Sequence, residues 1–166
     1  MPSVPAPLSR RAWFRAASVG AAATAVALVT RDGWADGLDQ LAAAAPTITL
    51  YKSPSCGCCK LWVDHAQKNG FTVSVQDVAD LNPIKQRFGV PGRLQSCHTG
   101  LVGGYVIEGH VPADLVHRLL KEKPNAIGLA VPGMPVGSPG MEGGTPERYD
   151  VLLFDRAGKT TVFAKR

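Results

Sequence analysis

The chain has few charged residues, and its basic residues are not clustered. Lys, Arg, Asp and Glu make up 19% of its 166 residues, below the roughly 25% typical of globular proteins. After Pro46 the basic residues are scattered, with no run longer than Lys165–Arg166 and no aromatic residues interleaved with them. The net charge of +5 therefore predicts a solvated basic surface, and we expect no nucleic-acid partner, which would require a basic groove.

Several catalytic and membrane patterns are also missing. No Ser/His/Asp set and no pair of carboxylates at hydrolase spacing stands out. The glycine-rich stretch 133–144 lacks the strand-to-helix context and the Lys-Ser/Thr ending of a phosphate-binding loop. The apolar stretch Ala16–Val29 has about fourteen residues, fewer than the about 20 that span a membrane. These absences disfavour a hydrolase, a nucleotide-binding protein and a membrane-spanning one.

The N-terminal region has the features of an export signal. Arg10 and Arg11 precede the moderately hydrophobic stretch Ala16–Val29, an arrangement that resembles a twin-arginine (Tat) signal. Ala42–Ala45 offers small residues for cleavage shortly before Pro46. We therefore expect residues 1–45 to be a Tat-type signal peptide and spacer. The remainder would then be periplasmic without stable membrane insertion, whereas an uncleaved signal would anchor it in the membrane.

The rest of the chain has the pattern of a small α/β domain. Alternating β-branched residues predict strands, and apolar residues at helical spacing predict helices. The expected order is strand, helix, strand, helix, strand, strand, helix, at residues 47–51, 58–69, 71–75, 82–88, 97–102, 105–107 and 112–120. That order is typical of a thioredoxin-like fold. We expect residues 46–166 to form a thioredoxin-like metal-binding domain with a Gly/Pro-rich loop, 125–144, and a C-terminal β-hairpin, 149–164, appended.

Three of the four cysteines lie within four positions, Cys56, Cys58 and Cys59. A disulfide between the neighbours would be strained, and one between Cys56 and Cys59 closes too short a loop to constrain the unfolded chain much. The cluster stands where a strand ends and a helix begins, and the N–H groups and dipole of a helix start favour thiolates. Metal binding fits this pattern, and so does thiol–disulfide exchange through the C-x-x-C pair Cys56 and Cys59.

The fourth cysteine favours the metal hypothesis. In a thioredoxin-like fold the loop that enters the third strand lies against the cysteine turn. A redox enzyme of this fold normally has a cis-proline there, whereas this chain has Ser96-Cys97-His98-Thr99. Cys97 would bring a fourth sulfur to the other three. Four converging thiolates would scramble disulfides, but they suit a soft metal ion.

The cysteine spacing also bears on which metal is bound. One tetrahedral zinc ion would need Cys58 and Cys59 to converge, which neighbours do not do easily. Cu(I) forms thiolate-bridged clusters and accepts thioether sulfur. We therefore expect copper, with zinc as the alternative, and expect structural or surface roles for His65, His110 and His117. The candidate ligands are Cys56, Cys58, Cys59 and Cys97, followed by His98, Met134 and Met141.

Four stretches carry a family resemblance: Cys56–Cys59, Ser96–Thr99, Tyr105–Pro112 and Val131–Glu142. Together they resemble the CopG-type copper-resistance proteins, a family long labelled only as a domain of unknown function. The resemblance covers residues 47–163. It implies a thioredoxin-like periplasmic protein with a copper–thiolate centre on the four cysteines, and it implies copper ions and other periplasmic copper-handling proteins as partners.

Three functions stay open at this point. The first is an exported protein that holds Cu(I) in a cysteine-thiolate site for copper resistance and homeostasis, with or without Cu(I)/Cu(II) redox activity. The second is a periplasmic thiol–disulfide oxidoreductase that uses Cys56 and Cys59. The third is a structural zinc-binding interaction module. Enzymatic activity, in either copper or disulfide redox chemistry, is compatible with the motifs but not required by them.

Overall fold

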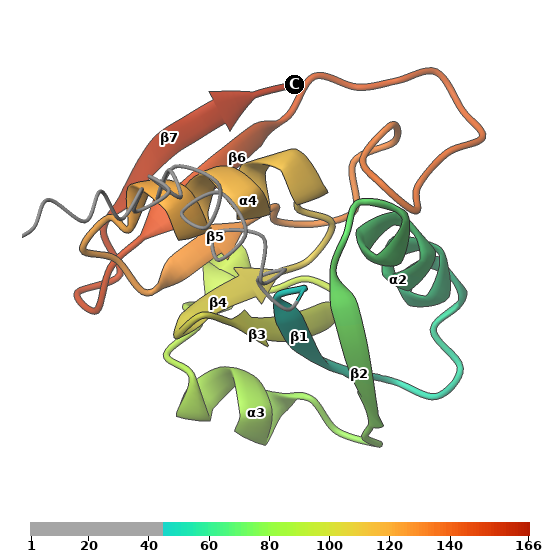
Figure 1. The fold of residues 1–166 in the computed structure, drawn as a ribbon, viewed down its shortest axis with the longest axis horizontal. Coiled ribbons are helices and arrows are strands. Elements are labelled where there is room, and N and C mark those ends of the chain that lie inside the picture. Colours follow the sequence, from blue (N-terminus) through green and yellow to red (C-terminus); the bar gives the residue numbers. More distant parts are fainter. Residues whose placement is uncertain (1–44) are drawn as a thin grey trace, which may run out of the picture. The chain divides into compact units, whose positions relative to one another are not determined.

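The computed structural model describes residues 45–166, and the expected export signal lies outside them. The described residues form a mixed α/β unit in which a seven-stranded sheet carries three α-helices (Figure 1). None of these helices is long and apolar enough to cross a bilayer. The elements are β1 (Thr47–Lys52), α2 (Gly57–Lys68), β2 (Thr72–Asp77), α3 (Asn82–Arg87), a 3₁₀ turn (Gly92–Leu94), β3 (His98–Val102), β4 (Tyr105–Glu108), α4 (Ala113–Glu122), β5 (Gly128–Ala130), β6 (Asp150–Phe154) and β7 (Thr160–Lys165).

The strand order brings two distant segments together. The sheet runs β2-β1-β3-β4-β5-β6-β7, with β1/β2 and β4/β5 parallel and the other neighbours antiparallel. In the β1/β3 pair, Lys52 lies opposite His98. The end of β1 and the start of β3 therefore meet at one edge of the sheet, where the cysteine turn follows Lys52 and Cys97 precedes His98.

Side chains alternate between the two faces of the sheet, and each face has its own core. Ile107 packs with Trp62 of α2 and Leu119 of α4, whereas the preceding Val106 packs with Phe154 on the opposite face. Figure 1 shows α2 and α4 on one side of the sheet and α3 on the other. The larger core is thus the one beneath α2, the helix that starts with the cysteines.

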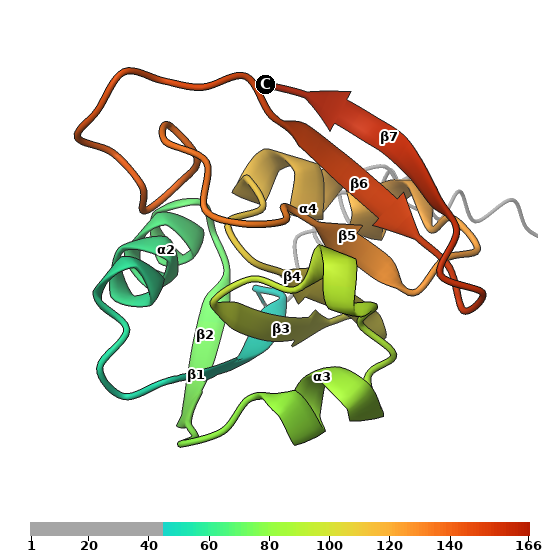
Figure 2. The same ribbon diagram turned by 180° about the vertical axis from the view of Figure 1, so that it is seen from behind.

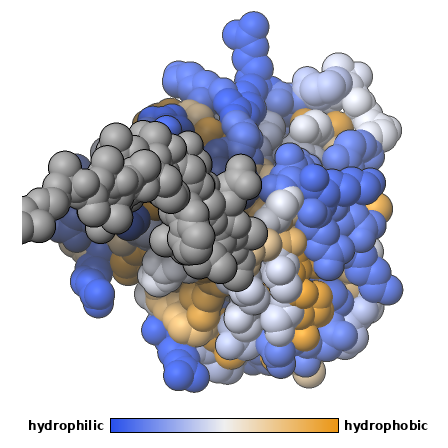
Figure 3. All heavy atoms as spheres, in the orientation of Figure 1, coloured by the Kyte–Doolittle hydropathy of each residue, from blue (hydrophilic) through white to orange (hydrophobic). Residues whose placement is uncertain are grey.

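Helix α2 is amphipathic, and the burial of its apolar face sets the direction in which its cysteines point. Trp62 and Ala66 are fully buried, and the indole N–H of Trp62 donates to the carbonyl of Val111, 3.0 Å away. Lys60 and Asp64 on the outer face of the helix are exposed, and Figure 3 shows mostly hydrophilic residues on the side of the molecule where α2 lies. The buried ring of Trp62 and the hydrogen bond of its N–H hold the N-terminal half of α2 against the sheet.

The structure corrects one part of the expected architecture. Residues 128–130, expected inside a Gly/Pro-rich loop, form strand β5 between β4 and β6. This strand has only three residues, and at Gly128 a Cβ atom would lie 1.8 Å from the carbonyl oxygen of Val106, so only glycine fits there. The expected hairpin is present as β6 and β7, but it continues the main sheet through β5. After β5 the chain swings out beside α2 before it returns as β6 (Figure 2).

Candidate metal centre

The four cysteines come from two segments at one edge of the sheet. Cys56 is the N-cap residue of α2, Cys58 and Cys59 lie in its first turn, and Cys97 directly precedes β3. All four sulfur atoms lie within 4.8 Å of one another. The expected approach of Cys97 to the other three is therefore seen in the structure, and the pairing of β1 with β3 explains it.

The sulfur atoms are in two chemical states. Cys56 and Cys59 form a disulfide, while Cys58 and Cys97 are free. The sulfur of Cys58 lies 3.5 Å from that of Cys56 and 3.9 Å from that of Cys97. Four thiolates were expected on the sequence pattern, so the structure differs: it contains two thiols beside one bridge between residues at positions i and i+3 of a helix start.

A histidine that the sequence pattern assigned to structure alone lies against Cys97. Nε2 of the fully buried His110 is 2.9 Å from the Cys97 sulfur, and its Nδ1 is 2.7 Å from the carbonyl oxygen of Pro139. Because a carbonyl only accepts, Nδ1 must carry the proton and Nε2 presents its lone pair to Cys97. A backbone carbonyl that fixes the tautomer in this way is the usual arrangement behind a metal-binding histidine.

The expected ligand candidate His98 lies on the other side of the same sulfur. Its Nδ1 is 3.3 Å from the Cys97 sulfur, and its ring contacts the rings of Trp62 and His110 at centroid distances of 4.8 and 5.1 Å. The side chain is completely buried, and among the described residues its Nε2 has no hydrogen-bond partner. Cys97, His98 and His110 thus offer a second group of ligand atoms within 4.8 Å of one another.

The Gly/Pro-rich segment 131–141 packs against this site. Gly140, at φ +86°, fits so closely that a Cβ there would lie 2.8 Å from the Cys58 carbonyl and 2.9 Å from the Trp62 backbone nitrogen. Met141 follows it and is half-buried, whereas Met134 is 50% exposed. The structure therefore brings the segment to the cysteines through its backbone, and thioether coordination by either methionine stays a prediction.

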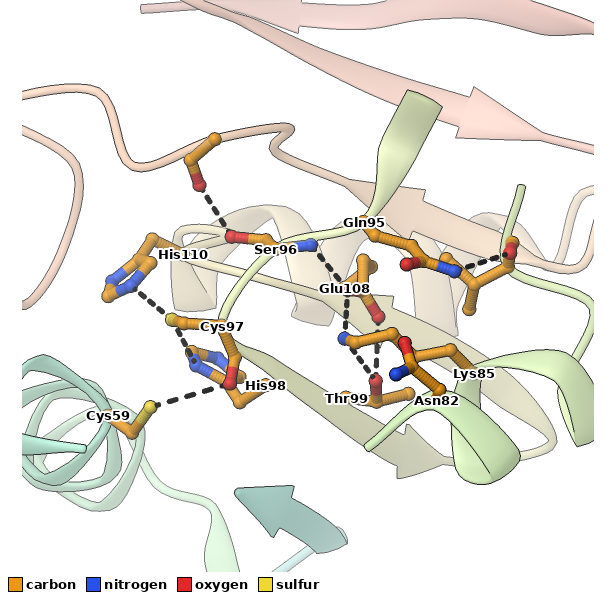
Figure 4. A network of polar contacts seen from close by, with 12 residues as sticks. Cys59, Asn82, Lys85, Gln95, Ser96, Cys97, His98, Thr99, Glu108 and His110 are labelled. Atoms are coloured by element: carbon orange, nitrogen blue, oxygen red, sulfur yellow. Dashed lines mark hydrogen bonds and ion pairs between the residues drawn. The ribbon is translucent and has the colours of Figure 1, made fainter. Parts of the chain in front are cut away.

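A buried ion pair holds the loop that carries Cys97 (Figure 4). Lys85 of α3 donates to the Glu108 carboxylate over 2.5 Å, and both side chains are almost fully buried. The other carboxylate oxygen accepts from the Thr99 hydroxyl at 2.7 Å, and the backbone N–H of Ser96 donates to the first at 2.7 Å. Because Ser96 and Thr99 flank Cys97, this network sets the position of its sulfur.

Burial shapes the protonation states of the centre. Burial, followed by the neighbouring Cys58 thiol, raises the pKa of Cys97 to about 12. Burial also lowers the pKa of His98 and of His110. At neutral pH the Cys97 thiol therefore keeps its proton and both imidazoles are neutral, so that the thiol can donate to Nε2 of His110. The low thiol pKa expected at a helix start does not apply to Cys97, which lies directly before β3 and not at a helix start.

Burial also raises the pKa of Glu108, against the opposing effect of Lys85 and of the hydrogen bonds from Ser96 and Thr99. A carboxylate at this depth needs all of these partners to remain charged.

The donor set fits a soft or borderline metal ion. Thiolate sulfur and imidazole nitrogen are the ligands that copper and zinc prefer, whereas Ca²⁺ and Mg²⁺ require oxygen. Metal–sulfur bonds of about 2.3 Å place two sulfur ligands about 3.8–4.0 Å apart, and the sulfurs of Cys58 and Cys97 are 3.9 Å apart. Nε2 of His98, which has no hydrogen-bond partner within normal geometry among the described residues, adds a buried nitrogen donor.

Sequence reasoning found the cysteines and missed the groups behind them. His110 stands thirteen residues after Cys97, and no spacing rule connects the two. Lys85 and Glu108 look like ordinary surface charges in the sequence. The available signal was the strand register, because β3 and β4 are adjacent and antiparallel and Thr99 faces Glu108.

Comparisons with known proteins identify the family of the chain. The family model described as "Protein of unknown function, DUF411" matches residues 94–141. The solved structure "Copper resistance protein copG- Form 2" is 44% identical, with a TM-score of 0.70 over 73% of this chain and 98% of that one. "Copper resistance protein copG- Form 1" is 45% identical, with a TM-score of 0.69 over 72% and 96%. No curated protein sequence matched. The chain belongs to the CopG copper-resistance family.

Proposed function

We propose that this protein is an exported copper-binding protein that holds Cu(I) between the start of α2 and the start of β3 and so contributes to copper resistance and homeostasis. The ligands proposed are Cys56, Cys58, Cys59 and Cys97, with His98, Met134 and Met141 as further candidates. The observation that carries the proposal is the convergence of four sulfur atoms within 4.8 Å in a chain of the CopG family.

The same proposal assigns the fold and the location. The order β1-α2-β2-α3-β3-β4-α4 with strands arranged β2-β1-β3-β4 supports a thioredoxin-like core, to which β5, β6 and β7 add an extension. The twin-arginine pattern in residues 1–45 supports export to the periplasm. Copper ions are the partner, and other copper-handling proteins of that compartment would deliver or accept them.

The residues around the site support binding more directly than catalysis. Thiolate sulfur stabilises Cu(I) over Cu(II) because it is a soft donor. Glu108 and Lys85 fix the position of Cys97, Pro139 fixes the tautomer of His110, and Gly140 closes the site on one side. An added imidazole nitrogen makes the site less exclusively soft, which supports interconversion of Cu(I) and Cu(II) as an extension of the proposal.

The direct test is an anaerobic Cu(I) titration of the dithiol-reduced protein against a competing chelator. We expect more than one Cu(I) per chain, and a loss of more than about 100-fold in affinity for Cys97→Ser, since removal of a ligand should exceed the 10–100-fold effect of a residue that supports one. Absence of Cu(I) binding, or equal binding by Cys97→Ser, would contradict the proposal. Binding of one zinc in preference to copper would favour the zinc module instead.

A second function is favoured by one observation, the disulfide between Cys56 and Cys59. A periplasmic thiol–disulfide oxidoreductase would use this pair and would not need Cys97. It predicts disulfide-reductase activity in metal-free protein, retained in Cys97→Ser. An insulin-reduction assay on both proteins distinguishes the two functions, because the copper proposal expects no such activity in either.

A further inference from the structure

The bridged and the free cysteines divide the site into two donor sets. With Cys56 and Cys59 bonded to each other, their sulfurs are not thiolates and are weak metal ligands. Cys58 and Cys97 remain free, and their sulfurs are already at the separation expected for two ligands of one ion. A copper site therefore does not vanish when the bridge forms, provided that a third ligand is present.

His110 supplies that third ligand. Three hydrogen bonds follow one another, from the Cys58 thiol to the Cys97 sulfur, from the Cys97 thiol to Nε2 of His110, and from Nδ1 of His110 to the Pro139 carbonyl. When copper binds, Nδ1 of His110 keeps its proton, because it donates to a fixed backbone oxygen. Copper can replace the two thiol protons of this series and meet two sulfurs and one nitrogen.

His98 is the less suitable third ligand in this state. It follows Cys97 in the chain, and its one contact with a donor atom, 3.3 Å from Nδ1 to the Cys97 sulfur, is to that neighbour. Its Nε2 has no hydrogen-bond partner within normal geometry among the described residues, so the tautomer of His98 is less firmly fixed than that of His110. His110, by contrast, is held by Pro139 and reaches the Cys97 sulfur from the connection between β4 and α4.

We propose, on the basis of the function proposed above, that Cys58, Cys97 and His110 form a one-copper site when Cys56 and Cys59 are bridged, and that reduction of this bridge converts it into a four-thiolate site of higher capacity. The reductant is a dithiol. It transfers two electrons and two protons, its own sulfurs form a disulfide, the Cys56–Cys59 bond breaks, and two thiols appear. The number of copper ions held is thus set by the redox state of one disulfide.

The experiment compares the two redox states of the full chain. One sample is oxidised and the other is reduced with a dithiol and desalted without oxygen. Alkylation after unfolding verifies two free thiols in the first and four in the second. Both are titrated with Cu(I) against a competing chelator, and bound copper is followed by the near-ultraviolet absorption of Cu(I)–thiolate. We expect one Cu(I) per oxidised chain and at least two per reduced chain.

His110→Gln identifies the nitrogen, with His117→Gln as the matched control because His117 is exposed and distant in sequence from the cysteines. We expect His110→Gln to weaken Cu(I) binding at least about tenfold in the oxidised state and to have a smaller effect in the reduced state, where four thiolates remain, and His117→Gln to behave as the wild type. Since His110 is buried, copper X-ray absorption of the oxidised wild type gives a second readout that needs no variant, with sulfur and imidazole scattering expected.

The outcomes separate this inference from the function it rests on. If the reduced protein binds copper and the oxidised protein binds none, or both bind the same number, the inference is wrong and the proposed function stands. Oxidised-state binding unchanged by His110→Gln, or scattering from sulfur alone, also overturns it. If neither state binds copper, the proposed function itself fails.

Discussion

The two cysteine pairs of the centre are held together by different means. Cys56 and Cys59 are three residues apart at one helix start, so local chain geometry alone brings them together. Cys58 and Cys97 are separated by 39 residues and meet because β1 pairs with β3. The disulfide is therefore a local property of the sequence, whereas the proposed copper site is a property of the packed fold. A substitution that disturbs the packing should therefore weaken copper binding and leave the Cys56–Cys59 disulfide unchanged.

The largest effect is expected from Glu108→Gln. The substitution removes the partner of buried Lys85 and should lower the free energy of unfolding by about 3–5 kcal/mol, measured by urea denaturation of the reduced, copper-free protein. Cu(I) affinity should fall with it, because the Ser96 N–H loses its charged acceptor. The equilibrium of the Cys56–Cys59 disulfide with a dithiol should stay unchanged.

Glu122→Gln is the control for this experiment. Glu122 also pairs with a basic residue, Arg118, but both side chains are nearly half exposed, and an exposed pair contributes only about 0.3–0.5 kcal/mol. An equally small effect of Glu108→Gln would mean that the buried pair does not hold the Cys97 loop. A shifted disulfide equilibrium would break the distinction between the two cysteine pairs.

A smaller effect is expected from Gly140→Ala. The added Cβ would meet the backbone of Cys58 and Trp62 at less than 3 Å and force segment 131–141 away from α2. Since Pro139, the hydrogen-bond partner of His110, directly precedes Gly140, Cu(I) binding by the oxidised protein should weaken, and the free energy of unfolding should fall by about 1–3 kcal/mol.

Gly143→Ala is the matched control, because its φ is also positive, +115°, but nothing lies within 4 Å of the new Cβ. It carries the backbone strain without the contact with α2. Urea denaturation and Cu(I) titration of the two variants thus separate the two causes. Identical losses in both would show that backbone strain, and not closure of the site, explains the result.

The smallest effect concerns pH and a residue outside the centre. Nε2 of His65 accepts the backbone N–H of Ala113 at the start of α4, 3.1 Å away, and burial lowers the pKa of His65 below 6.5. The unfolded chain then takes up a proton that the folded chain resists. Stability is fully present above pH 6.5 and falls as the pH drops from 6.5 through the folded-state pKa.

His65→Gln should flatten part of this slope, measured by urea denaturation of copper-free protein between pH 5 and 8. His98 and His110, whose pKa values are also lowered, contribute in the same direction, and Glu108, whose pKa is raised, contributes in the opposite one. The same pH dependence in the variant and the wild type would contradict the role of His65.

The division between local and tertiary features also explains what could be predicted from the sequence. Periodicity gave β1, α2 and the hairpin β6/β7 to within a few residues, because their apolar patterns lie within single segments. Cys97 was found because the order of elements brings the start of β3 to the start of α2. Strand β5 was missed because its three residues are defined by their neighbours, β4 and β6.

The groups behind the ligands could not be found in this way. The ion pair of Lys85 and Glu108 joins a helix to a strand over 23 residues, and the contact of His110 with Pro139 spans 29. Neither pattern is periodic, and neither residue type is unusual where it stands. Their roles follow from burial, which turns an ordinary lysine, glutamate or histidine into a group that must have a partner.

The central claim is that copper lies between the start of α2 and the start of β3, and anomalous diffraction at the copper edge tests it most directly. Crystals of the reduced, Cu(I)-loaded protein should show anomalous peaks beside the sulfurs of Cys58 and Cys97, with further peaks beside Cys56 and Cys59. Peaks confined to surface histidines such as His117, or none at all in protein shown to be loaded, would contradict the account.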